Sequence, residues 1–275
     1  MVRLSNASIG MLNFFSLVTG IGAIVIGLYF YVYGGTYCQK IIQNPLFLLG
    51  LFIFVFSLLG LMGSCCKINF LLNFYLFVLV LMILGLLALT GFVFAITHEG
   101  GSTKAVEGIG FKEYRVQDYS DWLQKHFTDG KTWRQIRSCL VDAQVCSSLS
   151  KNVVPEASEF YKMKMSPIQS GCCKPPMSCG FEYKNATFWT VPESGLKEEG
   201  DHDCISWSNH QDTLCYDCLS CKGGVLAFIK KEWRFFAYFN LALLVFFNLI
   251  LSMACCARRN NIEDQGYRRY RGYHW

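Results

Sequence analysis

Residues 171–179 read GCCKPPMSC, which places three cysteines and a double proline within nine residues. Cysteines at this spacing suit three roles: they bind a metal ion, provide a nucleophile or form disulfides. Thiolates bind zinc only when they are reduced, whereas disulfides persist in oxidising compartments. The interpretation of this stretch therefore depends on the side of a membrane on which it lies.

Four long segments of the chain are apolar and free of charged residues, at 9–33, 46–64, 70–96 and 235–256. A helix needs about 20 predominantly apolar residues to cross about 30 Å of hydrocarbon. We therefore predict an all-α membrane protein with four transmembrane helices, at residues 9–33, 46–64, 70–96 and 233–256.

The segments between and beyond these spans are very unequal in length. They are an N-terminal segment (1–8), a small loop (34–45), a link (65–69), a large loop (97–232) and a C-terminal tail (257–275). The tail carries five arginines, and Arg3 and Lys67 lie on the same side. The positive-inside rule then predicts cytosolic termini and two extracellular loops.

The net charge of +5 agrees with this topology. Residues 97–231 hold 16 Lys and Arg against 17 Asp and Glu, so the excess positive charge lies at the cytosolic ends. We interpret it as attraction to an anionic inner leaflet, and we expect no nucleic-acid partner.

Ten of the fourteen cysteines fall in the two extracellular loops. The large loop alone holds nine, an odd number, so complete pairing requires one bridge to the small loop. We predict five disulfides in an oxidising compartment, one of them made by Cys38. The ten cysteines are Cys38, Cys139, Cys146, Cys172, Cys173, Cys179, Cys204, Cys215, Cys218 and Cys221.

The other four cysteines form two doublets at predicted cytosolic helix ends, Cys65-Cys66 and Cys255-Cys256. Juxtamembrane cysteines are candidates for S-palmitoylation, although a small apolar residue at a helix end is the simpler alternative. Asn185 begins the sequon Asn-Ala-Thr in the large loop and is a predicted glycosylation site.

No pattern in the large loop favours catalysis or a cofactor. The Cys215-x2-Cys218-x2-Cys221 spacing suits zinc, but oxidised cysteines favour disulfides. A CxxC redox centre needs a thioredoxin-like context, and the histidines accompany no nucleophile motif. The carboxylates of Asp201 and Asp203 are interpreted as surface charge. We expect no enzyme, no cofactor and no metal site.

Small or polar residues recur every seven positions in the first two spans. Such a series lets two helix backbones approach closely and is typical of left-handed helix pairs. The series are Asn13, Gly20, Gly27 and Gly34 in the first span and Gly50, Ser57 and Ser64 in the second.

The spans contain amides and hydroxyls but no ionisable groups. We expect the amides and hydroxyls to bond between helices. A solute or ion carrier usually places ionisable residues inside the bundle, so that class is disfavoured.

The large loop divides into two parts by pattern. Residues 104–150 have helical periodicity, with Tyr119, Trp122, Leu123 and Phe127 on one face. A second stripe follows the break at Asp129-Gly130 and contains Trp133, Ile136, Leu140 and Ala143. Residues 151–221 are rich in Pro, Gly and Cys and predict a disulfide-framed subdomain. Helix resumes at about 222–232 and leads into the fourth span.

These features together resemble the tetraspanin family over essentially the whole chain. The resemblance rests on four spans, a small first loop and a cysteine-rich second loop with a CC doublet. Pro176-Met177-Ser178-Cys179 is similar to the family's P-x-S-C element, and Asn13 stands where the family commonly has a polar residue. GCCKPP replaces the usual C-C-G and resembles the plant tetraspanins, the group with the senescence-associated proteins; Cys38 also fits that group.

The resemblance implies a scaffold of the plasma membrane that associates with other tetraspanins and other membrane proteins in the bilayer. It also implies that the doublet pairs with the P-x-S-C cysteine and with a cysteine near the fourth span, such as Cys218 or Cys221. Cys179 is only six residues from Cys173, however, so we assign no connectivity. We expect residues 182–214 to be the recognition surface. The alternative is a four-span junction protein of the claudin type, which usually has its larger loop between the first two spans.

Overall fold

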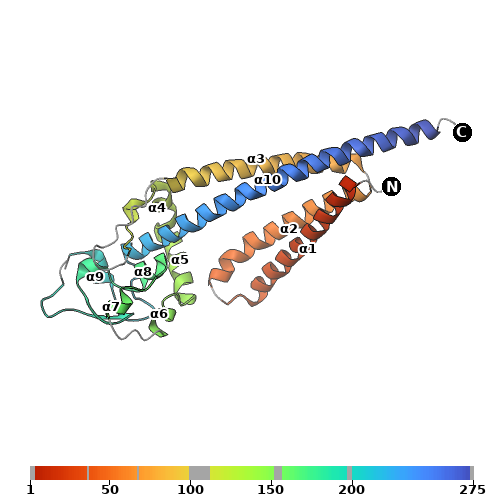
Figure 1. Cartoon of the computed structure of the whole chain (residues 1–275). Helices are drawn as coiled ribbons and strands as arrows, with labels where there is room; N and C mark the ends of the chain where they lie inside the picture. The colour runs from red at the N-terminus through yellow and green to blue at the C-terminus, as the bar shows by residue number, and fades with distance from the viewer. Residues whose placement is uncertain are drawn as a thin grey trace. The chain divides into compact units, whose positions relative to one another are not determined.

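The computed structural model describes residues 4–35, 37–66, 68–98, 112–151, 157–196 and 200–272 (Figure 1). Residues 1–3 and 273–275 of the predicted cytosolic ends, Lys67 of the link and part of the predicted helical region (104–111) lie outside these ranges. The long helices are α1 (Leu4–Tyr33), α2 (Tyr37–Cys65), α3 (Asn69–His98) and α10 (Leu219–Gly272). The short elements are η1 (Val116–Asp118), α4 (Asp121–Phe127), α5 (Gly130–Asp142), α6 (Ser147–Lys151), α7 (Ala157–Phe160), α8 (Pro167–Cys172), η2 (Met177–Cys179), β1 (Glu182–Asn185), β2 (Phe188–Thr190) and α9 (His202–Ser206).

Among the described residues, the four long helices are apolar enough to cross a membrane. The short elements between α3 and α10 are joined by disulfides. This arrangement confirms the predicted fold class, a four-span helical membrane protein with a disulfide-rich, partly helical loop between its third and fourth spans.

The helices continue beyond the predicted spans. α2 already begins at Tyr37, so most of the predicted small loop (34–45) is helical. α10 begins at Leu219 and continues through the tail to Gly272. A helix ends where its backbone is interrupted rather than where hydrocarbon ends, and Pro45 inside α2 does not end it. The membrane boundaries themselves stay predictions.

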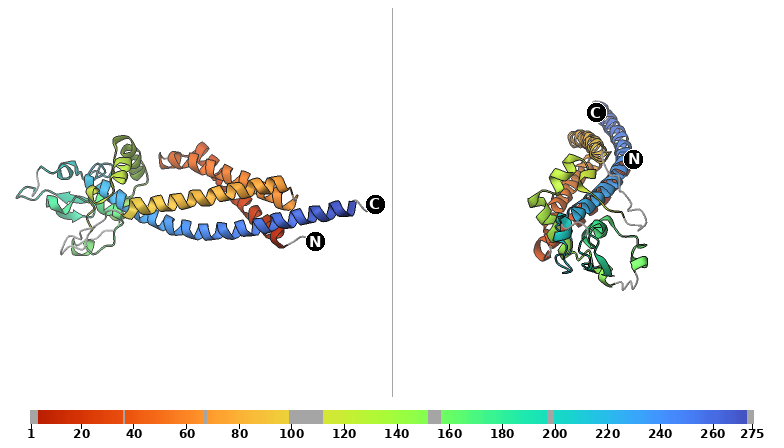
Figure 2. Two further views of the ribbon diagram at one scale, coloured as in Figure 1. Left: turned by 90° about the horizontal axis from the view of Figure 1, so that it is seen from above. Right: turned by 90° about the vertical axis from the view of Figure 1, so that its left-hand side faces the viewer.

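The chain divides into two compact units, which we describe separately. The bundle unit comprises Met1–Gly91 and Tyr238–Trp275, and the loop unit comprises Phe92–Ala237. In the bundle unit, α1 and α2 run alongside each other (Figures 1 and 2). The apolar core of this unit joins Ile9 of α1 to residues of α3 and α10, among them Leu79 and Leu244.

Glycines of the seven-residue series lie at the contact between α1 and α2. A Cβ on Gly20 would lie 2.9 Å from the backbone N of Phe54, and one on Gly50 would lie 2.8 Å from that of Ile24. A Cβ on Gly27 would lie 3.1 Å from the Cβ of Phe47. Each step up α1 is matched by a step down α2, as expected for antiparallel helices. Gly34 differs, because it follows the end of α1 and lies against Phe30 of that same helix.

The polar members of the series are buried in the bundle unit. The Asn13 amide lies where a Cβ on Gly60 of α2 would be, and its Nδ2 donates to the carbonyl of Ile9 on α1 at 2.9 Å. Ser57 is fully buried, and Ser64 is close to Gly10 of α1. Gly60 of α2 therefore leaves the space that the Asn13 amide of α1 occupies.

The prediction that span hydroxyls and amides bond between helices is wrong for several residues. Thr90 donates to the carbonyl of Leu86, and Asn248 donates to that of Leu244. The carbonyl four residues earlier is always within reach of a short polar side chain on a helix, so it competes with a neighbouring helix.

The core of the loop unit is built from aromatic residues and cysteines. It includes Trp133, Phe160, Trp189, Leu214 and Tyr216, together with the bridged cysteines. The predicted stripe of α5 contributes Trp133, Ile136 and Leu140, but Ala143 is exposed because α5 ends at Asp142.

A second apolar cluster joins the first residues of the loop unit to α10. Tyr119 and Leu123 pack with Leu226 of α10, and Trp122 and Phe127 pack on the same cluster, so the predicted face of α4 is buried together. The hydroxyl of Ser120 donates to the carbonyl of Ile96 near the end of α3. These contacts hold α4 against the helices that begin and end the large loop.

Candidate functional site

Four disulfides join segments of the loop unit. Cys172, the last residue of α8, pairs with Cys221 in the first turn of α10. Its neighbour Cys173 pairs with Cys146. The remaining bridges are Cys179–Cys204 and Cys215–Cys218.

The pairing agrees with the resemblance at one cysteine of the doublet and differs at the other. Cys172 reaches a cysteine near the fourth span, as implied. Cys173, however, pairs with Cys146 and not with Cys179 of the P-x-S-C element. Cys179 instead fastens residue Cys204 of α9. Each of the three cysteines in GCCKPPMSC thus has a separate partner outside this stretch, because the chain has extra cysteines.

The three cysteines with zinc-like spacing are divided between two bridges. Cys215 and Cys218 pair with each other, and Cys221 pairs with Cys172. Cys38 and Cys139 are disulfide-bonded as well. The bridge between the small loop and the large loop stays a prediction.

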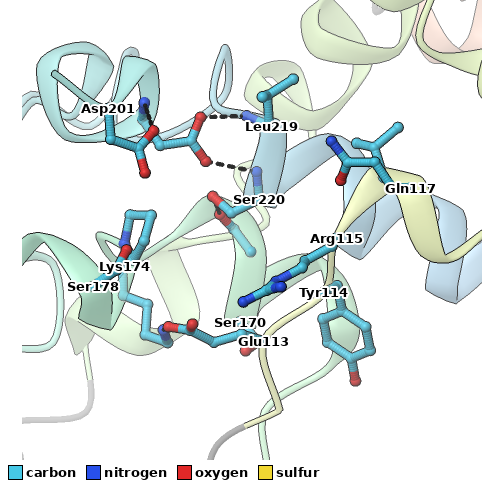
Figure 3. Close-up of a pocket in the computed structure, with 14 residues that line it drawn as sticks. Glu113, Tyr114, Arg115, Gln117, Ser170, Lys174, Ser178, Asp201, Leu219 and Ser220 are labelled. Carbon is cyan, nitrogen blue, oxygen red and sulfur yellow. Dashed lines mark hydrogen bonds and ion pairs between the residues drawn. The ribbon is translucent and has the colours of Figure 1, made fainter. Parts of the chain in front are cut away.

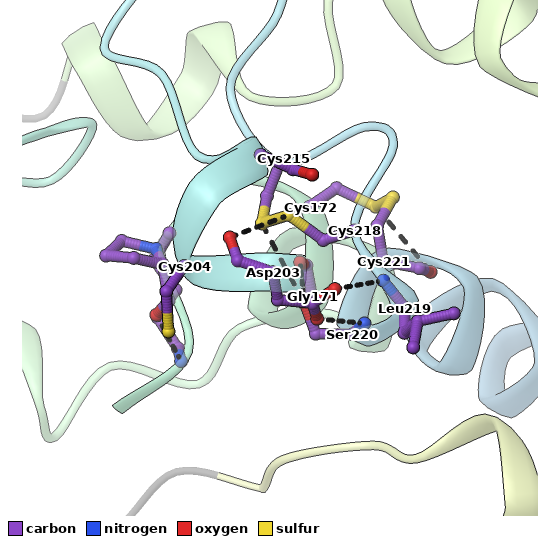
Figure 4. Close-up of a disulfide and its surroundings, with 12 residues drawn as sticks. Gly171, Cys172, Asp203, Cys204, Cys215, Cys218, Leu219, Ser220 and Cys221 are labelled. Carbon is purple, nitrogen blue, oxygen red and sulfur yellow. Dashed lines mark hydrogen bonds between the residues drawn. A yellow bond between two sulfur atoms is a disulfide. The ribbon is translucent and has the colours of Figure 1, made fainter. Parts of the chain in front are cut away.

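The carboxylate of Asp203 holds the N-terminus of α10. It accepts hydrogen bonds from the backbone N–H groups of Leu219 at 2.6 Å and Ser220 at 2.8 Å (Figure 4). Asp203 is only 5% exposed, so its interpretation as surface charge is wrong. The first N–H groups of a helix have no partner within the helix, and a carboxylate there is also stabilised by the helix dipole. Sequence analysis missed this role because the cap lies 16 residues before the helix that it serves.

Close backbone contacts bring α8 and the residues before η1 against the start of α10. A Cβ on Gly171 would lie 3.1 Å from the Cα of Cys221. A Cβ on Gly223 would lie 2.6 Å from the carbonyl oxygen of Tyr114. Any larger residue would separate these segments, so the glycine before the cysteine doublet is required for the Cys172–Cys221 bridge.

Lys174, the lysine of GCCKPP, is buried beside this bridge. Its side chain is 2% exposed, and its ammonium lies 3.7 Å from the carboxylate of Glu113, which is 27% exposed. The same carboxylate accepts a hydrogen bond of 2.8 Å from the backbone N–H of Met177. Burial lowers the pKa of Lys174, and the nearby Glu113 opposes that shift. Glu113 therefore ties residues preceding η1 to the signature at two points.

A pocket of about 280 Å³ lies where these segments meet (Figure 3). Residues 113–117 form one side of it, and the signature forms another through Lys174, Pro176 and Ser178. The rest of the lining comes from Ser170 and Gly171 of α8, Asp201 and Asp203 of the α9 region, and Leu219 and Ser220 of α10. Four segments that are distant in sequence thus surround one polar space.

Residues 182–214, the expected recognition surface, are partly core. β1 and β2 form an antiparallel hairpin, and the indole of Trp189 on β2 is buried. The Asn209 side chain both accepts from the N–H of Trp189 and donates to its carbonyl, each at 2.9 Å, so it extends the hairpin. Asn185 is exposed at the end of β1, where its side chain accepts from the N–H of Thr187 in the hairpin turn at 3.1 Å.

The exposed part of this segment includes large apolar side chains. Phe188 is 47% exposed, Val191 58% and Ile205 70%. Elsewhere in the chain, the thiols of Cys65, Cys66, Cys255 and Cys256 are free and exposed. Glycosylation at Asn185 and palmitoylation at these four cysteines stay predictions.

The chain is similar to known proteins over nearly its whole length. The tetraspanin family model matches residues 5–258. Tetraspanin-8 of Arabidopsis thaliana is 43% identical over 274 residues, covering 99% of each chain. Tetraspanin-11 of the same plant is 45% identical over 266 residues, covering 95% of this chain and 97% of the relative. Protein TORNADO 2, also from Arabidopsis thaliana, is 36% identical over 271 residues, covering 98% and 99%. The chain, a multi-pass membrane protein with plant relatives, belongs to the tetraspanin family.

Proposed function

We propose that this tetraspanin is a scaffold that gathers other membrane proteins, further tetraspanins among them, into lateral assemblies in the plasma membrane. In this proposal it binds partners and catalyses no reaction. Because the chain belongs to the tetraspanin family, we do not retain the alternative of a claudin-type junction protein.

The observation that carries the proposal is the way in which the loop unit presents residues 182–214. The Cys179–Cys204 bridge fixes this segment to the signature, and the two Asn209 hydrogen bonds join its hairpin to its C-terminal part, while Phe188, Val191 and Ile205 stay exposed. Apolar side chains that are exposed on a rigid support lose little conformational entropy on binding, which favours association with a protein partner.

Several groups of the loop unit with potential for chemistry have structural partners instead. Asp203 caps α10, Lys174 is paired with Glu113, and the described cysteines of this unit are bridged. These commitments support binding rather than catalysis as the role of the large loop.

The proposed topology has both termini in the cytosol and the large loop outside the cell. The arginine-rich tail supports it by the positive-inside rule, and the bridged loop cysteines suit an oxidising compartment. Acylation of the exposed doublets and glycosylation of exposed Asn185 belong to this proposal.

The test is purification of the intact protein in mild detergent from its own cells, followed by identification of the membrane proteins that co-purify. A Phe188→Ser/Val191→Ser variant removes two exposed apolar side chains from the segment. A Lys131→Ser/Arg134→Ser variant on α5 is the control, because it removes two exposed long side chains elsewhere in the same unit.

We expect the first variant to lose specific partners at unchanged thermal stability and the control to keep them. Partner lists that are identical for both variants would place recognition in the spans. A wild-type protein without reproducible membrane partners would contradict the scaffold itself.

A further inference from the structure

The pocket beside the signature has no part in the proposed scaffold function. Its lining contains five charged side chains, contributed by Glu113, Arg115, Lys174, Asp201 and Asp203. Whether such a pocket can bind a ligand depends on how many of these charges are already neutralised within the protein.

Three of the five charges are committed to partners. Lys174 is paired with Glu113, and that carboxylate also accepts from Met177. Both oxygens of Asp203 accept from the N-terminus of α10. These groups shape the pocket, and none of them needs a ligand.

The other two charges retain unused hydrogen-bonding capacity. Among the residues that the structure describes, the guanidinium of Arg115 has no hydrogen bond and no ion pair. Asp201 uses one carboxylate oxygen to accept from the N–H of Asp203 at 3.0 Å, and its second oxygen has no partner within the described ranges. Figure 3 shows both side chains pointing into the space, from different walls. The pocket thus offers one positive and one negative group.

We propose that this pocket binds a small zwitterion, an amino acid or a short peptide. The ligand's carboxylate pairs with the Arg115 guanidinium, whose planar fork matches a carboxylate in two parallel hydrogen bonds. The ligand's ammonium pairs with the free oxygen of Asp201. The side chains of Gln117 and Ser178, which border the same region, supply further polar contacts for a peptide group.

Ligands of a single charge suit the pocket less well. An inorganic anion at Arg115 would face the carboxylates of Asp201 and Asp203, and a metal cation at Asp201 would face Arg115 and Lys174. A volume of about 280 Å³ also excludes all but small ligands. Because the Cys172–Cys221 and Cys179–Cys204 bridges fix the walls, binding requires little ordering of the protein.

The test uses the full chain in lipid nanodiscs and saturation-transfer NMR titrations. Two zwitterions serve as probes, L-glutamine for free amino acids and glycylglycine for peptides. N-acetylglycylglycine, without the ammonium, and glycylglycinamide, without the carboxylate, are the matched capped probes. We expect saturable binding of at least one zwitterion, and whichever binds more tightly identifies the source. When glycylglycine is the binder, we expect each capped form to bind roughly tenfold more weakly. When only glutamine binds, N-acetylglutamine and glutamine amide take their place.

Two variants test which residue binds each charged group of the ligand. Arg115→Gln should remove the preference for a free carboxylate and keep that for a free ammonium. Asp201→Asn should do the reverse, because asparagine still caps α9 through its side-chain oxygen. Arg134→Gln, at an exposed position of α5, should bind as the wild type does. Thermal unfolding confirms that all three are folded.

Absence of saturable binding by both zwitterions would overturn the proposal. So would affinities that are insensitive to capping or to both substitutions. Either result leaves the scaffold proposal untouched, because partner recognition there depends on Phe188 and Val191 and not on the pocket.

Discussion

Buried polar side chains of the bundle unit bond mainly within their own helix, whereas those of the loop unit bond between distant segments. Thr90 and Asn13 each donate to the carbonyl four residues earlier. In the loop unit, Glu113 accepts from Met177 and Asp203 from Leu219, across 64 and 16 residues. The bundle unit has its own long-range bond, between the amides of Asn6 and Asn261 at 3.0 Å, and glycines such as Gly20 and Gly50 let the backbones of α1 and α2 approach closely.

The difference follows from the solvent of each region. In hydrocarbon, helices satisfy their own backbones, and close approach of small residues provides the dispersion contacts between them. The loop unit is built mostly from short helices and irregular segments, and covalent bridges and buried charges fix these segments to one another. The loop unit should therefore be the more sensitive to loss of single long-range links.

The largest expected effect is loss of the bridge between the signature and α10. A Cys172→Ala/Cys221→Ala variant opens a loop of 49 residues. From the loop-closure entropy, we expect it to lose roughly 4 kcal/mol of unfolding free energy. Cys215→Ala/Cys218→Ala is the matched control, since its cysteines are equally buried but only 3 residues apart, for which the estimate is under roughly 2 kcal/mol. Thermal unfolding in nanodiscs, monitored by tryptophan fluorescence, measures both. If both variants lost equal stability, the length of the loop that a bridge closes would not determine how much the bridge stabilises the protein.

The next effect concerns the buried ion pair. Glu113→Gln leaves Lys174 buried without its counter-charge and should cost about 3 kcal/mol at neutral pH. Lys174→Met should cost only roughly 1 kcal/mol, because Glu113 is partly exposed and still accepts from Met177. The exposed Lys184–Glu182 pair is the control, and Glu182→Gln should change stability little. Urea unfolding of the four proteins tests this order.

The pH dependence of Glu113→Gln gives an independent check. Burial already lowers the pKa of Lys174 below its ordinary value of 10.5, and removal of Glu113 removes the opposing effect. The unfolded chain then holds more protons than the folded one, so stability rises with pH. We expect the deficit of Glu113→Gln to shrink as pH increases from 7 toward the range of tyrosine ionisation near roughly 10. A constant deficit would mean that Lys174 is not the group responsible.

In the bundle unit, Gly50→Ala should separate α1 from α2. The new Cβ would lie 2.8 Å from a backbone nitrogen, and such overpacking costs about 2 kcal/mol. Gly22→Ala is the control on α1, because its Cβ would meet no atom within 4 Å. Resistance to unfolding in mixed detergent, with bridges intact, measures the two variants. If Gly22→Ala were as unstable as Gly50→Ala, the close contact at Gly50 would not be the cause of the instability.

The same difference explains what could be predicted from the sequence. The spans and the small-residue series depend on composition and period along one helix, so they can be recognised without knowledge of neighbours. The partners of Cys172 and Cys173 could not be assigned, because ten cysteines permit roughly a thousand pairings. Lys174 drew no attention and Asp203 was misinterpreted, because each is buried by a segment far along the chain. Ala143 was placed one residue beyond the end of its helix, within the ordinary uncertainty of helix ends.

The smallest effect tests whether a side-chain cap belongs with these long-range links. Asp203→Ala removes two hydrogen bonds from the start of α10 and should cost about 1.5 kcal/mol. Asp217→Ala, an exposed carboxylate paired with Arg137 at 3.2 Å, is the control and should cost about 0.5 kcal/mol or less. Hydrogen exchange distinguishes the two, since only Asp203→Ala should expose the amides of Leu219 and Ser220. The Cys172–Cys221 bridge fixes the same turn of α10 that Asp203 caps. We therefore expect the loss of unfolding free energy in a variant that lacks both the bridge and Asp203 to differ from the sum of the two separate losses. Simple additivity would show that cap and bridge stabilise α10 independently, and that the loop unit is a set of separate fastenings rather than one cooperative frame.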